Sequence, residues 1–489
     1  ETFMPVKHFK NMVAHTHQDG REESGHSVEV VAPYDQQLIA TVAQSDADEI
    51  ELALDTAYQL YRDRENWLSK SERIEILRRV VLLMGEQADE LALEAAREGG
   101  KPLMDSKVEV ARAIDSIQIA IDCLRTESGQ SIPMGINPAS ADKLAFTTHE
   151  PIGVVVAVSA FNHPLNLIAH QVGPAIAAGC PVIVKPAEVT PLSCLRFVKI
   201  VREAGLPEAW CQALLPQSRE LSTKLVSDSR VAFLSFIGSA KVGWMLRSKL
   251  APGARCALEH GGVAPVIIAE DADIEKAIPK LLKGGFYHAG QVCVSVQRIY
   301  AHESIAIKLA QTLAVEAKKI IIGDPTEAKT EVGPLIKPAE VARISSWVQE
   351  AIAEGAKLLC GGEAISVDGV ETSYACTVLY NPSVNSKVSS QEIFGPVICI
   401  YPYSDIDEAV TQANALSFSF QAACFTESIE RANYLYRNLD ASAVMVNDHT
   451  AFRVDWMPFA GLRESGLGVG GIPYTLRDMQ VEKMLVINN

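Results

Sequence analysis

The sequence predicts an α/β protein built on parallel sheets. Strand-like apolar runs alternate with helix-like periods over residues 154–250, and a second alternation of the same kind covers residues 266–319. A repeated strand, helix, strand order makes neighbouring strands parallel, with helices on both faces and ligands at the carboxyl ends of the strands. Because 489 residues exceed one small core, we expect two or three subdomains.

The first alternation begins at residues 154–160, a continuous β-rich run that is typical of a strand buried on both faces. The other strands expected in this series are 181–184, 212–215 and 231–236, and the expected helices are 165–178, 192–203, 221–226 and 241–250. The second series has expected strands at 266–269 and 294–300 and helices at 274–288 and 305–319. Before residue 122 the chain is mainly helical, with expected helices at 47–62, 70–96 and 106–125.

Composition and charge favour a soluble enzyme. The chain has 44 Lys and Arg residues against 60 Asp and Glu residues, a formal net charge of −16, which argues against nucleic acid or an anionic membrane as the main partner. Its ten cysteines are scattered without a CxxC pair. Such spacing provides neither a metal site nor a disulfide framework, and it fits a reducing cytoplasm.

One uncharged stretch, residues 151–184, is long enough to suggest a membrane-spanning helix. Three prolines and three glycines interrupt it, and its Asn, His and Gln side chains would be costly in lipid. We therefore expect a buried strand, a loop, a helix and a second strand, and no membrane association. The first residues, 1–4, show no signal-peptide pattern and no initiator Met, so we expect the native start to lie upstream.

Glu259 and Cys293 are the strongest catalytic candidates. Glu259 lies in a glycine-bordered turn, and Cys293 follows it by 34 residues. A thiolate is a strong nucleophile, and a nearby carboxylate whose pKa is tuned by burial can take a proton from the thiol or from water. A cysteine is often only a small buried hydrophobe, but Gly284, Gly285 and Gly290 lie just upstream, where the backbone must approach something closely. The pair predicts covalent chemistry at a carbonyl carbon.

A dinucleotide site is expected at strand ends rather than at the GxGxxG match of residues 466–471. That match lies 18 residues from the C-terminus, too close for the required strand-helix-strand unit, so we expect a loop there. Better candidates are Lys185 to Glu188, at the end of a buried strand, and Gly238-Ser239, between a strand and a helix. Backbone N–H groups at a helix N-terminus suit a phosphate, although Ser239 could equally be a plain N-cap.

Several of these segments together resemble the aldehyde dehydrogenase superfamily over nearly the whole chain. The resembling segments are 150–153, 161–165, 185–188, 236–239, 258–262, 290–293 and 391–396. The wider context, including 290–298 and 455–459, is most similar to lactaldehyde and phosphonoacetaldehyde dehydrogenase-like bacterial members. The resemblance implies a Rossmann-like parallel-sheet cofactor domain in 1–124 and 146–258. It further implies an α/β catalytic domain in 259–467 and a small β oligomerisation arm in 125–145 and 468–489.

The resemblance also implies a role for each catalytic residue. Cys293 would attack the aldehyde to form a thiohemiacetal, and the amide of Asn162 and the backbone N–H of Cys293 would hold its oxyanion. After hydride transfer to the nicotinamide, Glu259 would activate the water that hydrolyses the thioester. Without the resemblance, the sequence is also compatible with a structural role for Asn162 as a loop cap.

The cofactor residues implied by the resemblance are Phe161, Lys185, Glu188, Gly238, Ser239, Gly243, Glu392 and Phe394. Lys185 would bind the adenosine ribose and Ser239 the pyrophosphate, while Glu392 and Phe394 would position the nicotinamide ribose and ring. A carboxylate at Glu188 accepts a ribose 2′-hydroxyl and repels a 2′-phosphate, so we expect NAD rather than NADP.

Arg112, His163 and Arg453 are the expected substrate residues. Two guanidiniums at the substrate mouth would favour an anionic aldehyde, and the alternative is that each arginine makes a structural salt bridge. Three functions stay open: NAD-dependent oxidation of a small aldehyde, a CoA-acylating oxidation, and a non-catalytic binding protein on the same scaffold. The presence of Glu259 argues against the CoA route. The resemblance implies a homodimer or homotetramer, joined through the arm near 125–145 and a terminal strand at 483–487.

Overall fold

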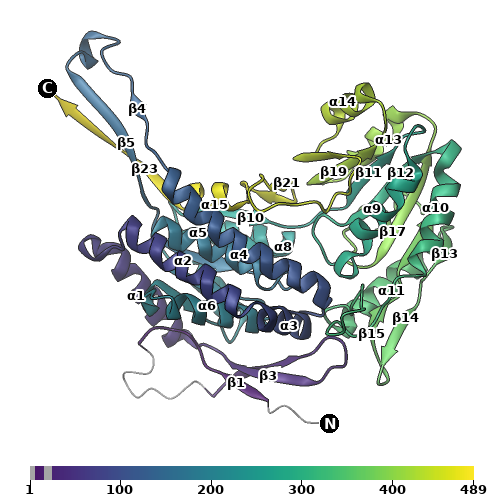
Figure 1. Ribbon diagram of the computed structural model, residues 1–489, viewed down its shortest axis with the longest axis horizontal. Helices are drawn as coiled ribbons and strands as arrows, with labels where there is room; N and C mark the ends of the chain where they lie inside the picture. Colours follow the sequence, from purple (N-terminus) through teal and green to yellow (C-terminus); the bar gives the residue numbers. More distant parts are fainter. Residues whose placement is uncertain (1–5, 16–24) are drawn as a thin grey trace.

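Two largely parallel sheets organise the computed structural model, which describes residues 6–15 and 25–489 (Figure 1). The first sheet has the order β22-β10-β9-β6-β7-β8, and every neighbouring pair from β10 to β8 is parallel. Its strands are β6 (Val154–Val158), β7 (Val182–Lys185), β8 (Cys211–Ala213), β9 (Val231–Ile237), β10 (Arg255–Glu259) and β22 (Gly466–Leu467). The α/β class predicted from the alternation is confirmed.

Helices cover both faces of the first sheet. They are α1 (Ala47–Arg62), α2 (Lys70–Glu86), α3 (Ala88–Gly99), α4 (Leu103–Thr126), α5 (Asn166–Ala178), α6 (Leu192–Glu203), α7 (Arg219–Ser227), α8 (Ala240–Lys249) and α15 (Ile472–Asp478). All five residues of β6 are buried, as expected of a central strand between two helical layers.

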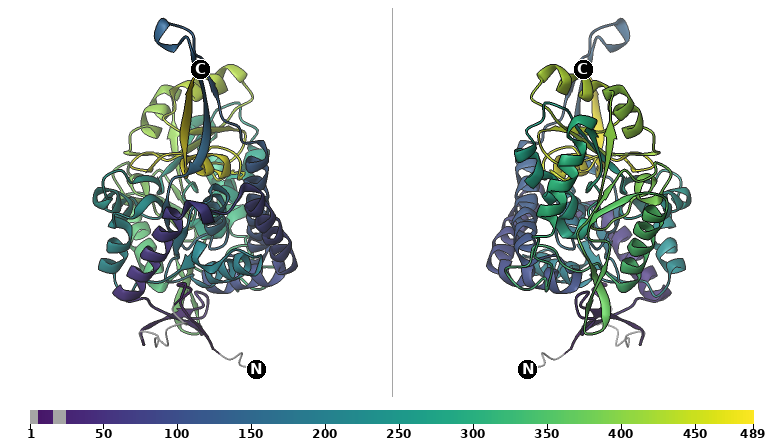
Figure 2. Two further views of the ribbon diagram at one scale, coloured as in Figure 1. Left: turned by 90° about the vertical axis from the view of Figure 1, so that its left-hand side faces the viewer. Right: turned by 90° about the vertical axis from the view of Figure 1, so that its right-hand side faces the viewer.

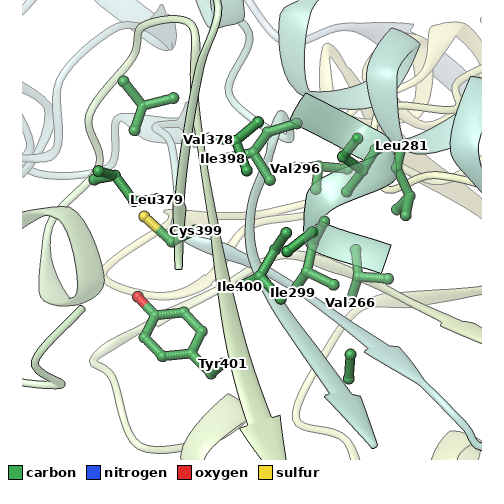
Figure 3. Packing of buried hydrophobic residues seen from close by; sticks show 14 of the residues in the cluster. Val266, Leu281, Val296, Ile299, Val378, Leu379, Ile398, Cys399, Ile400 and Tyr401 are labelled. Atoms are coloured by element: carbon green, nitrogen blue, oxygen red, sulfur yellow. The ribbon is translucent and has the colours of Figure 1, made fainter. Parts of the chain in front are cut away.

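The second sheet has the order β13-β16-β17-β12-β11-β19-β20. Its strands are β11 (Ala264–Ile268), β12 (Val296–His302), β13 (Lys357–Cys360), β16 (Thr377–Tyr380), β17 (Val397–Tyr403), β19 (Gln421–Phe425) and β20 (Ala443–Val446). The helices around it are α9 (Ile274–Phe286), α10 (Glu303–Ala317), α11 (Pro338–Ala353), α12 (Lys387–Ser390), α13 (Ile406–Ala413) and α14 (Ile429–Asn438). Figure 3 shows its core, in which Val266, Val296 and Ile299 belong to the same buried cluster as Leu281 of α9.

The connection between the two sheets determines where they face each other. β10 ends at Glu259 and β11 begins at Ala264, so four residues carry the chain from one sheet to the next. The carboxyl ends of the parallel strands in the first sheet therefore point toward the amino ends of the parallel strands in the second. Side chains that follow β6, β7, β9 and β10, and side chains that precede β11, β12 and β17, are brought to this junction.

A narrow three-stranded arm stands away from the body (Figures 1 and 2). It is formed by β4 (Ser131–Ile132), β5 (Lys143–Pro151) and β23 (Gln480–Asn488), and β23 pairs antiparallel with β5 along its whole length. The terminal strand expected at 483–487 is present and is longer than expected. Its apolar residues are exposed, and they include Met484 and Leu485, each 51% exposed.

The described part of the chain also holds shorter elements. They are β1 (Lys7–Phe9), β2 (Ser27–Val31), β3 (Leu38–Ala43), β14 (Ala364–Val367), β15 (Val370–Tyr374), β18 (Phe418–Ser419), β21 (Leu462–Arg463), and the 3₁₀ helices η1 (Arg64–Asn66), η2 (Pro138–Ser140), η3 (Glu208–Trp210) and η4 (Tyr287–Gly290). Residues 1–4, on which the signal-peptide expectation rests, lie outside the described residues. Within those residues, no helix combines the length and the apolar character needed to cross a membrane.

Several predicted helix bounds differ from the structure, such as that of the helix expected over 106–125, which begins at Leu103, and two of the differences have a local cause. The helix expected over 70–96 is broken at Gln87, where φ is −102° and ψ is 11°. Gly85 weakens the end of α2, and the acidic residues Asp89 and Glu90 favour a new helix start, so α3 begins at Ala88. The helix expected to reach residue 288 ends at Phe286, because the backbone turns left-handed shortly after it.

Candidate active site

Cys293 lies between η4 and β12, at the amino end of that strand. Three consecutive residues before it have left-handed backbone: φ is 50° at His288, 55° at Ala289 and 71° at Gly290. At Gly290 a Cβ would lie 1.9 Å from the carbonyl oxygen of Gly395, so only glycine fits the third position. This turn presents the half-buried cysteine toward the junction of the two sheets.

The Gln291 side chain holds the backbone just before the cysteine. It donates from Nε2 to two backbone carbonyls and accepts one backbone N–H at Oε1, over distances of 3.0 to 3.3 Å. Asn162, which follows β6 and is 5% exposed, donates from Nδ2 to the backbone oxygen of Gln291 at 3.0 Å. An amide group has two N–H donors, so one is left for a second acceptor near Cys293.

Glu259 reaches the junction from the first sheet as the last residue of β10. A Cβ on Gly470 would lie 2.1 Å from Glu259 Oε1, and a Cβ on Gly466 would lie 2.3 Å from the backbone oxygen of Leu258. The loop expected for this glycine-rich segment is thus partly wrong, since its first two residues form β22 and pair antiparallel with β10. Its glycines let the chain close against β10 and the Glu259 carboxyl.

The charge of Glu259 acts on the Cys293 thiol. Burial raises the pKa of the Cys293 thiol to about 12, the negative charge of Glu259 adds to this, and Arg453 opposes it. Burial also raises the pKa of Glu259, again with Arg453 acting in the opposite direction. At neutral pH the thiol is therefore protonated and needs a base, and a carboxylate with a raised pKa is suited to be that base.

Lys185, Gly238 and Ser239 lie along one edge of the first sheet. Lys185 ends β7, and Gly238 and Ser239 follow β9, so all three are at the carboxyl ends of parallel strands. Ser239 is the N-cap of α8, and its Oγ accepts the N–H of Val242 at 3.4 Å, as in the plain-cap alternative. The other N–H groups in the first turn of a helix have no intrahelical partner, so they still suit a phosphate.

Glu188 is exposed three residues after Lys185. Burial lowers the pKa of Lys185, and the charge of Glu188 partly offsets this, which indicates that the two side chains are close. Gly243 is placed differently: a Cβ there would lie 1.9 Å from Nε2 of His260, so this glycine makes room for an imidazole.

Glu392 and Phe394 precede β17 on the opposite side of the junction. Burial raises the pKa of Glu392 to about 8, and among the described residues its buried Oε2 has no hydrogen-bond partner. A Cβ on Gly261 would lie 1.5 Å from this oxygen, so the glycine cradles the carboxyl. Phe394 has a φ of 50°, and its ring meets Phe161 edge to face with centroids 5.8 Å apart. The structure thus brings Phe161 and Phe394 together.

The two arginines expected at the substrate mouth are joined through Asp455, which the sequence analysis did not single out as a site residue. Arg112 donates to both carboxylate oxygens of Asp455, at 2.9 and 3.2 Å, and its side chain is 31% exposed. His170 Nε2 donates to Asp455 at 2.7 Å, and its Nδ1 lies 3.5 Å from Nη2 of Arg453. The sequence analysis gave a structural salt bridge as the alternative to substrate binding, and Arg112 makes such a salt bridge with Asp455.

Arg453 is only 12% exposed and lies over the ring of Phe459, with its guanidinium carbon 3.7 Å from the ring centroid. Its Nη2 is 4.0 Å from Glu259 Oε1, and its Nε is buried without a hydrogen-bond partner among the described residues. Its positive charge therefore stands beside both Glu259 and Cys293. His163, the third expected substrate residue, directly follows Asn162, and its ring stacks on Tyr287 with centroids 6.1 Å apart.

We expect Asp455→Ala to destabilise the protein by about 3 kcal/mol at pH 7, because it leaves a partly buried guanidinium without its partner. Burial alone would raise the pKa of Asp455, but His170 and Arg112 lower it below its ordinary value. A carboxyl with a lowered pKa stabilises the fold above its unfolded pKa, about 3.9, and this contribution is lost as the pH falls below it.

Urea unfolding at several pH values checks this expectation. The stability difference between wild type and Asp455→Ala should stay nearly constant from pH 6 to pH 4 and shrink as the pH is lowered from 4 toward 2. Glu354→Ala, an exposed carboxylate at the end of α11, serves as the control and should stay close to wild type. A pH-independent difference would contradict the ion-pair explanation.

Comparison with known proteins assigns the chain to a family. It matches the model of the aldehyde dehydrogenase family over residues 21–485. It is 36% identical to 3-sulfolactaldehyde dehydrogenase of Priestia aryabhattai over 467 residues, 96% of each chain. Among solved structures, it resembles aldehyde dehydrogenase 21 from Physcomitrella patens in complex with the reaction product succinate, with a TM-score of 0.93, 34% identity and 99% of both chains covered.

A second solved structure resembles the chain almost as closely. Glyceraldehyde-3-phosphate dehydrogenase GapN from Methanocaldococcus jannaschii, complexed with NADP, has a TM-score of 0.89 and 34% identity, with 95% of this chain and 100% of that chain covered. Both structures share the two-sheet fold and similarity over nearly the full length. With the family model matched from residue 21 to residue 485, the chain belongs to the aldehyde dehydrogenase family and is an aldehyde dehydrogenase.

Proposed function

We propose that this enzyme oxidises a small aldehyde to its carboxylic acid with NAD, through a covalent intermediate on Cys293. The observation that supports this most strongly is the convergence at the sheet junction. The Cys293 thiol, the Glu259 carboxyl and the Asn162 amide come from three segments that are distant in sequence, and their electrostatic and hydrogen-bond connections join them there.

In the first step Glu259 removes the thiol proton, and Sγ of Cys293 attacks the carbonyl carbon of the aldehyde. The carbonyl oxygen becomes an oxyanion. It accepts hydrogen bonds from the free Nδ2 hydrogen of Asn162 and from the backbone N–H of Cys293. Because Gln291 fixes the backbone between these two donors, little reorganisation is needed when the charge develops.

The dinucleotide fits the residues along the junction. When bound, the dinucleotide would supply a hydride acceptor, and loss of hydride from the thiohemiacetal carbon would leave a thioester on Cys293. The unpartnered Oε2 of Glu392 is an acceptor for a ribose hydroxyl, and the exposed N-terminus of α8 suits the pyrophosphate. Lys185 and Glu188 lie where the adenosine ribose would be held, and the charge of Glu188 favours NAD over NADP.

In the last step Glu259, having passed the thiol proton to solvent, takes a proton from water, and the resulting hydroxide attacks the thioester carbon. The carboxylic acid leaves, and the Cys293 thiolate recovers its proton. Gly470 leaves no side chain between Glu259 and the backbone behind it, so the carboxyl stays at the junction. A CoA-acylating reaction would not need this base.

We propose an anionic or hydroxylated substrate. Arg453 is buried with an unsatisfied Nε, so it can bind an anionic group of the substrate at low desolvation cost. The relatives point the same way, since one is named for 3-sulfolactaldehyde and another was solved with succinate. Arg112 keeps about a third of its side chain exposed and could assist from the mouth.

An aldehyde panel tests the proposed function. NADH absorbance would be followed with propanal, lactaldehyde, succinate semialdehyde and phosphonoacetaldehyde, each with NAD or NADP and with or without CoA. We expect CoA-independent oxidation with NAD and the highest kcat/KM for an anionic or hydroxylated aldehyde. Strict CoA dependence would favour the acylating route, and a stronger signal with NADP would contradict the assignment to Glu188. No oxidation of any aldehyde would reject the proposal.

Arg453→Ala is expected to raise the KM for succinate semialdehyde about tenfold more than the KM for propanal, because only the first has an anion for the guanidinium. Some loss on both substrates is expected, since the change also removes the charge that lowers the pKa of Glu259. Arg463→Ala, an exposed arginine paired with Asp440, is the control. Equal changes in KM for both aldehydes would remove the anion-site interpretation.

We further propose that the enzyme is a homodimer or homotetramer joined through the arm. Among the described residues β23 pairs only with β5, so its outer edge is open, and this strand has the exposed apolar side chains Met484 and Leu485. We also propose the domain division given in the sequence analysis. The ten free cysteines support a location in a reducing cytoplasm. Sedimentation velocity would test the assembly.

A further inference from the structure

A buried lysine lies directly behind His163. Lys101 is 1% exposed, and its Nζ is 2.7 Å from Glu109 Oε1 and 2.7 Å from His163 Nδ1. Gly100, with a φ of 76°, ends α3 and directs the chain inward at this point. The backbone oxygen of Lys101 accepts a hydrogen bond from Ser106 Oγ at 3.0 Å, so both its backbone and its side chain are held in place.

Glu109 connects this lysine to the segment that carries Asn162. Its second oxygen accepts the backbone N–H groups of Leu165 and Asn166, at 2.8 and 3.0 Å, at the start of α5. The carboxylate therefore serves both the lysine and the N-terminus of a helix, where negative charge is stabilised. The connection fixes the short loop between β6 and α5, in which His163 lies.

The lysine determines the protonation of His163. Burial alone would lower the pKa of Lys101, but Glu109 and Tyr287 raise it above its ordinary value, so the ammonium group is retained. An ammonium group can only donate hydrogen bonds, so Nδ1 of His163 must accept one. Burial and the Lys101 charge hold the pKa of His163 well below its ordinary value. The imidazole is then neutral, with its hydrogen on Nε2.

The Nε2–H group lies on the side of the ring away from Lys101, which holds Nδ1. Among the described residues it has no hydrogen-bond partner, and the ring is partly exposed. Arg112 and Arg453 both act on the ring electrostatically, so it lies within reach of the substrate-mouth guanidiniums. Stacking on Tyr287, at an interplanar angle of 18°, fixes the plane of the ring beside Asn162.

We propose that Lys101 fixes His163 as the Nε2–H tautomer, and that this N–H donates a hydrogen bond to an oxygen acceptor on the aldehyde attached to Cys293. The acceptor is a hydroxyl or anionic oxygen other than the carbonyl oxygen. This inference rests on the proposed function and narrows its substrate class. An aldehyde without such an oxygen leaves the donor unpaired, which lowers its relative kcat/KM. Lys101 is a positioning residue, and His163 is the specificity-determining contact.

Kinetics of two His163 variants test the contact. His163→Phe keeps the ring and removes the donor, whereas the amide of His163→Gln places an N–H close to the position of Nε2. Relative to propanal, we expect the kcat/KM of His163→Phe for lactaldehyde or succinate semialdehyde to fall about tenfold or more, and His163→Gln to recover most of it. The control is His302→Gln, at the opposite end of β12 from Cys293. An equal loss of kcat/KM for propanal, lactaldehyde and succinate semialdehyde would contradict the proposed contact of His163 with the substrate.

Nitrogen-15 NMR of histidine-labelled enzyme tests the tautomer without using activity. The His163 signals, identified by their absence in His163→Gln, should be those of a neutral Nε2–H ring from pH 5 to 8. In Lys101→Met/Glu109→Gln, which removes the buried pair together, the pKa of the ring should rise, because the Lys101 charge no longer lowers it although burial still does. An imidazolium or an Nδ1–H ring in the wild type would overturn the proposal. If this double variant does not fold, the wild-type spectrum and the kinetics still decide.

The two experiments separate this inference from the proposed function. If the wild type oxidises no aldehyde, the proposed function fails, while the NMR spectra still report the tautomer. The wild type could oxidise both propanal and the oxygen-bearing aldehydes, while His163→Phe changes the kcat/KM of every aldehyde equally. In that case only the inference fails, and the proposed function stands.

Discussion

Cys293→Ala is expected to lower aldehyde turnover by at least about 10⁴-fold, because alanine has no thiol to form the covalent intermediate. The fold should be unaffected, since the cysteine is half-buried and alanine removes only a sulfur atom at the start of β12. The residues assigned to the dinucleotide are unchanged, so NAD should bind with nearly wild-type affinity. Steady-state NADH formation and NAD titration by calorimetry measure the two properties separately.

The matched control for this variant is Cys123→Ala, on α4, another half-buried cysteine in the same chain. It should keep wild-type turnover. Appreciable oxidation by Cys293→Ala would contradict the nucleophile assignment. Loss of NAD binding together with activity would indicate a structural role for Cys293 instead.

Glu259→Gln is expected to stop the reaction after one turnover, with a steady-state rate about 10² to 10⁴-fold below wild type. Glutamine cannot take a proton from water, so the thioester on Cys293 should accumulate. The first step also loses its base, but removal of the Glu259 charge lowers the pKa of the thiol, so this step should slow less than the hydrolysis.

Stopped-flow absorbance and intact-protein mass spectrometry check this result. We expect a burst of one NADH per subunit and a mass increase equal to the acyl group. Glu464→Gln, which changes an exposed carboxylate bonded to Ser417, should behave as wild type. A variant that turns over without a burst, or that shows no covalent adduct, would remove Glu259 from the hydrolysis step.

Local sequence signals were sufficient for much of the fold. The bounds predicted for α1 and α6 agree with the structure at both ends, and the α1 start follows from the Asp46 side chain, which accepts the N–H of Glu49. Such caps and periodic apolar residues act over a few positions, so they can be recognised from the chain alone. The buried run at residues 154–158 is a further case, since continuous apolar strands are typical of parallel sheets.

Parallel topology also made part of the candidate site predictable. Once β7, β9 and β10 are parallel strands of one sheet, the residues at their carboxyl ends must share an edge. Lys185, Ser239 and Glu259 therefore lie along the same edge of the first sheet, whatever the chemistry of their side chains. Their chemical roles, and the place of Cys293 opposite them, came from the resemblance to a family and not from periodicity.

Other features depend on contacts that leave no local trace. Arg112 and Asp455 are 343 positions apart, and nothing in either neighbourhood indicates their pairing. Gly466 is part of the GxGxxG match and Gly470 lies within it, yet these glycines accommodate the backbone of β10 and the Glu259 carboxyl. Glycine allows close approach either to a phosphate or to another segment of the protein. Only the group that lies against it shows which of the two roles it has.

The sequence by itself determined the α/β class, the parallel strands and the family, because these follow from repeated local patterns and from motifs in order. Only the tertiary structure decided how the charges around the nucleophile are balanced. It placed Arg453 beside Glu259, joined Arg112 and His170 through Asp455, and buried Lys101 behind His163. Protonation and charge depend on burial and on distances of a few ångströms between remote segments, and folding alone determines those distances.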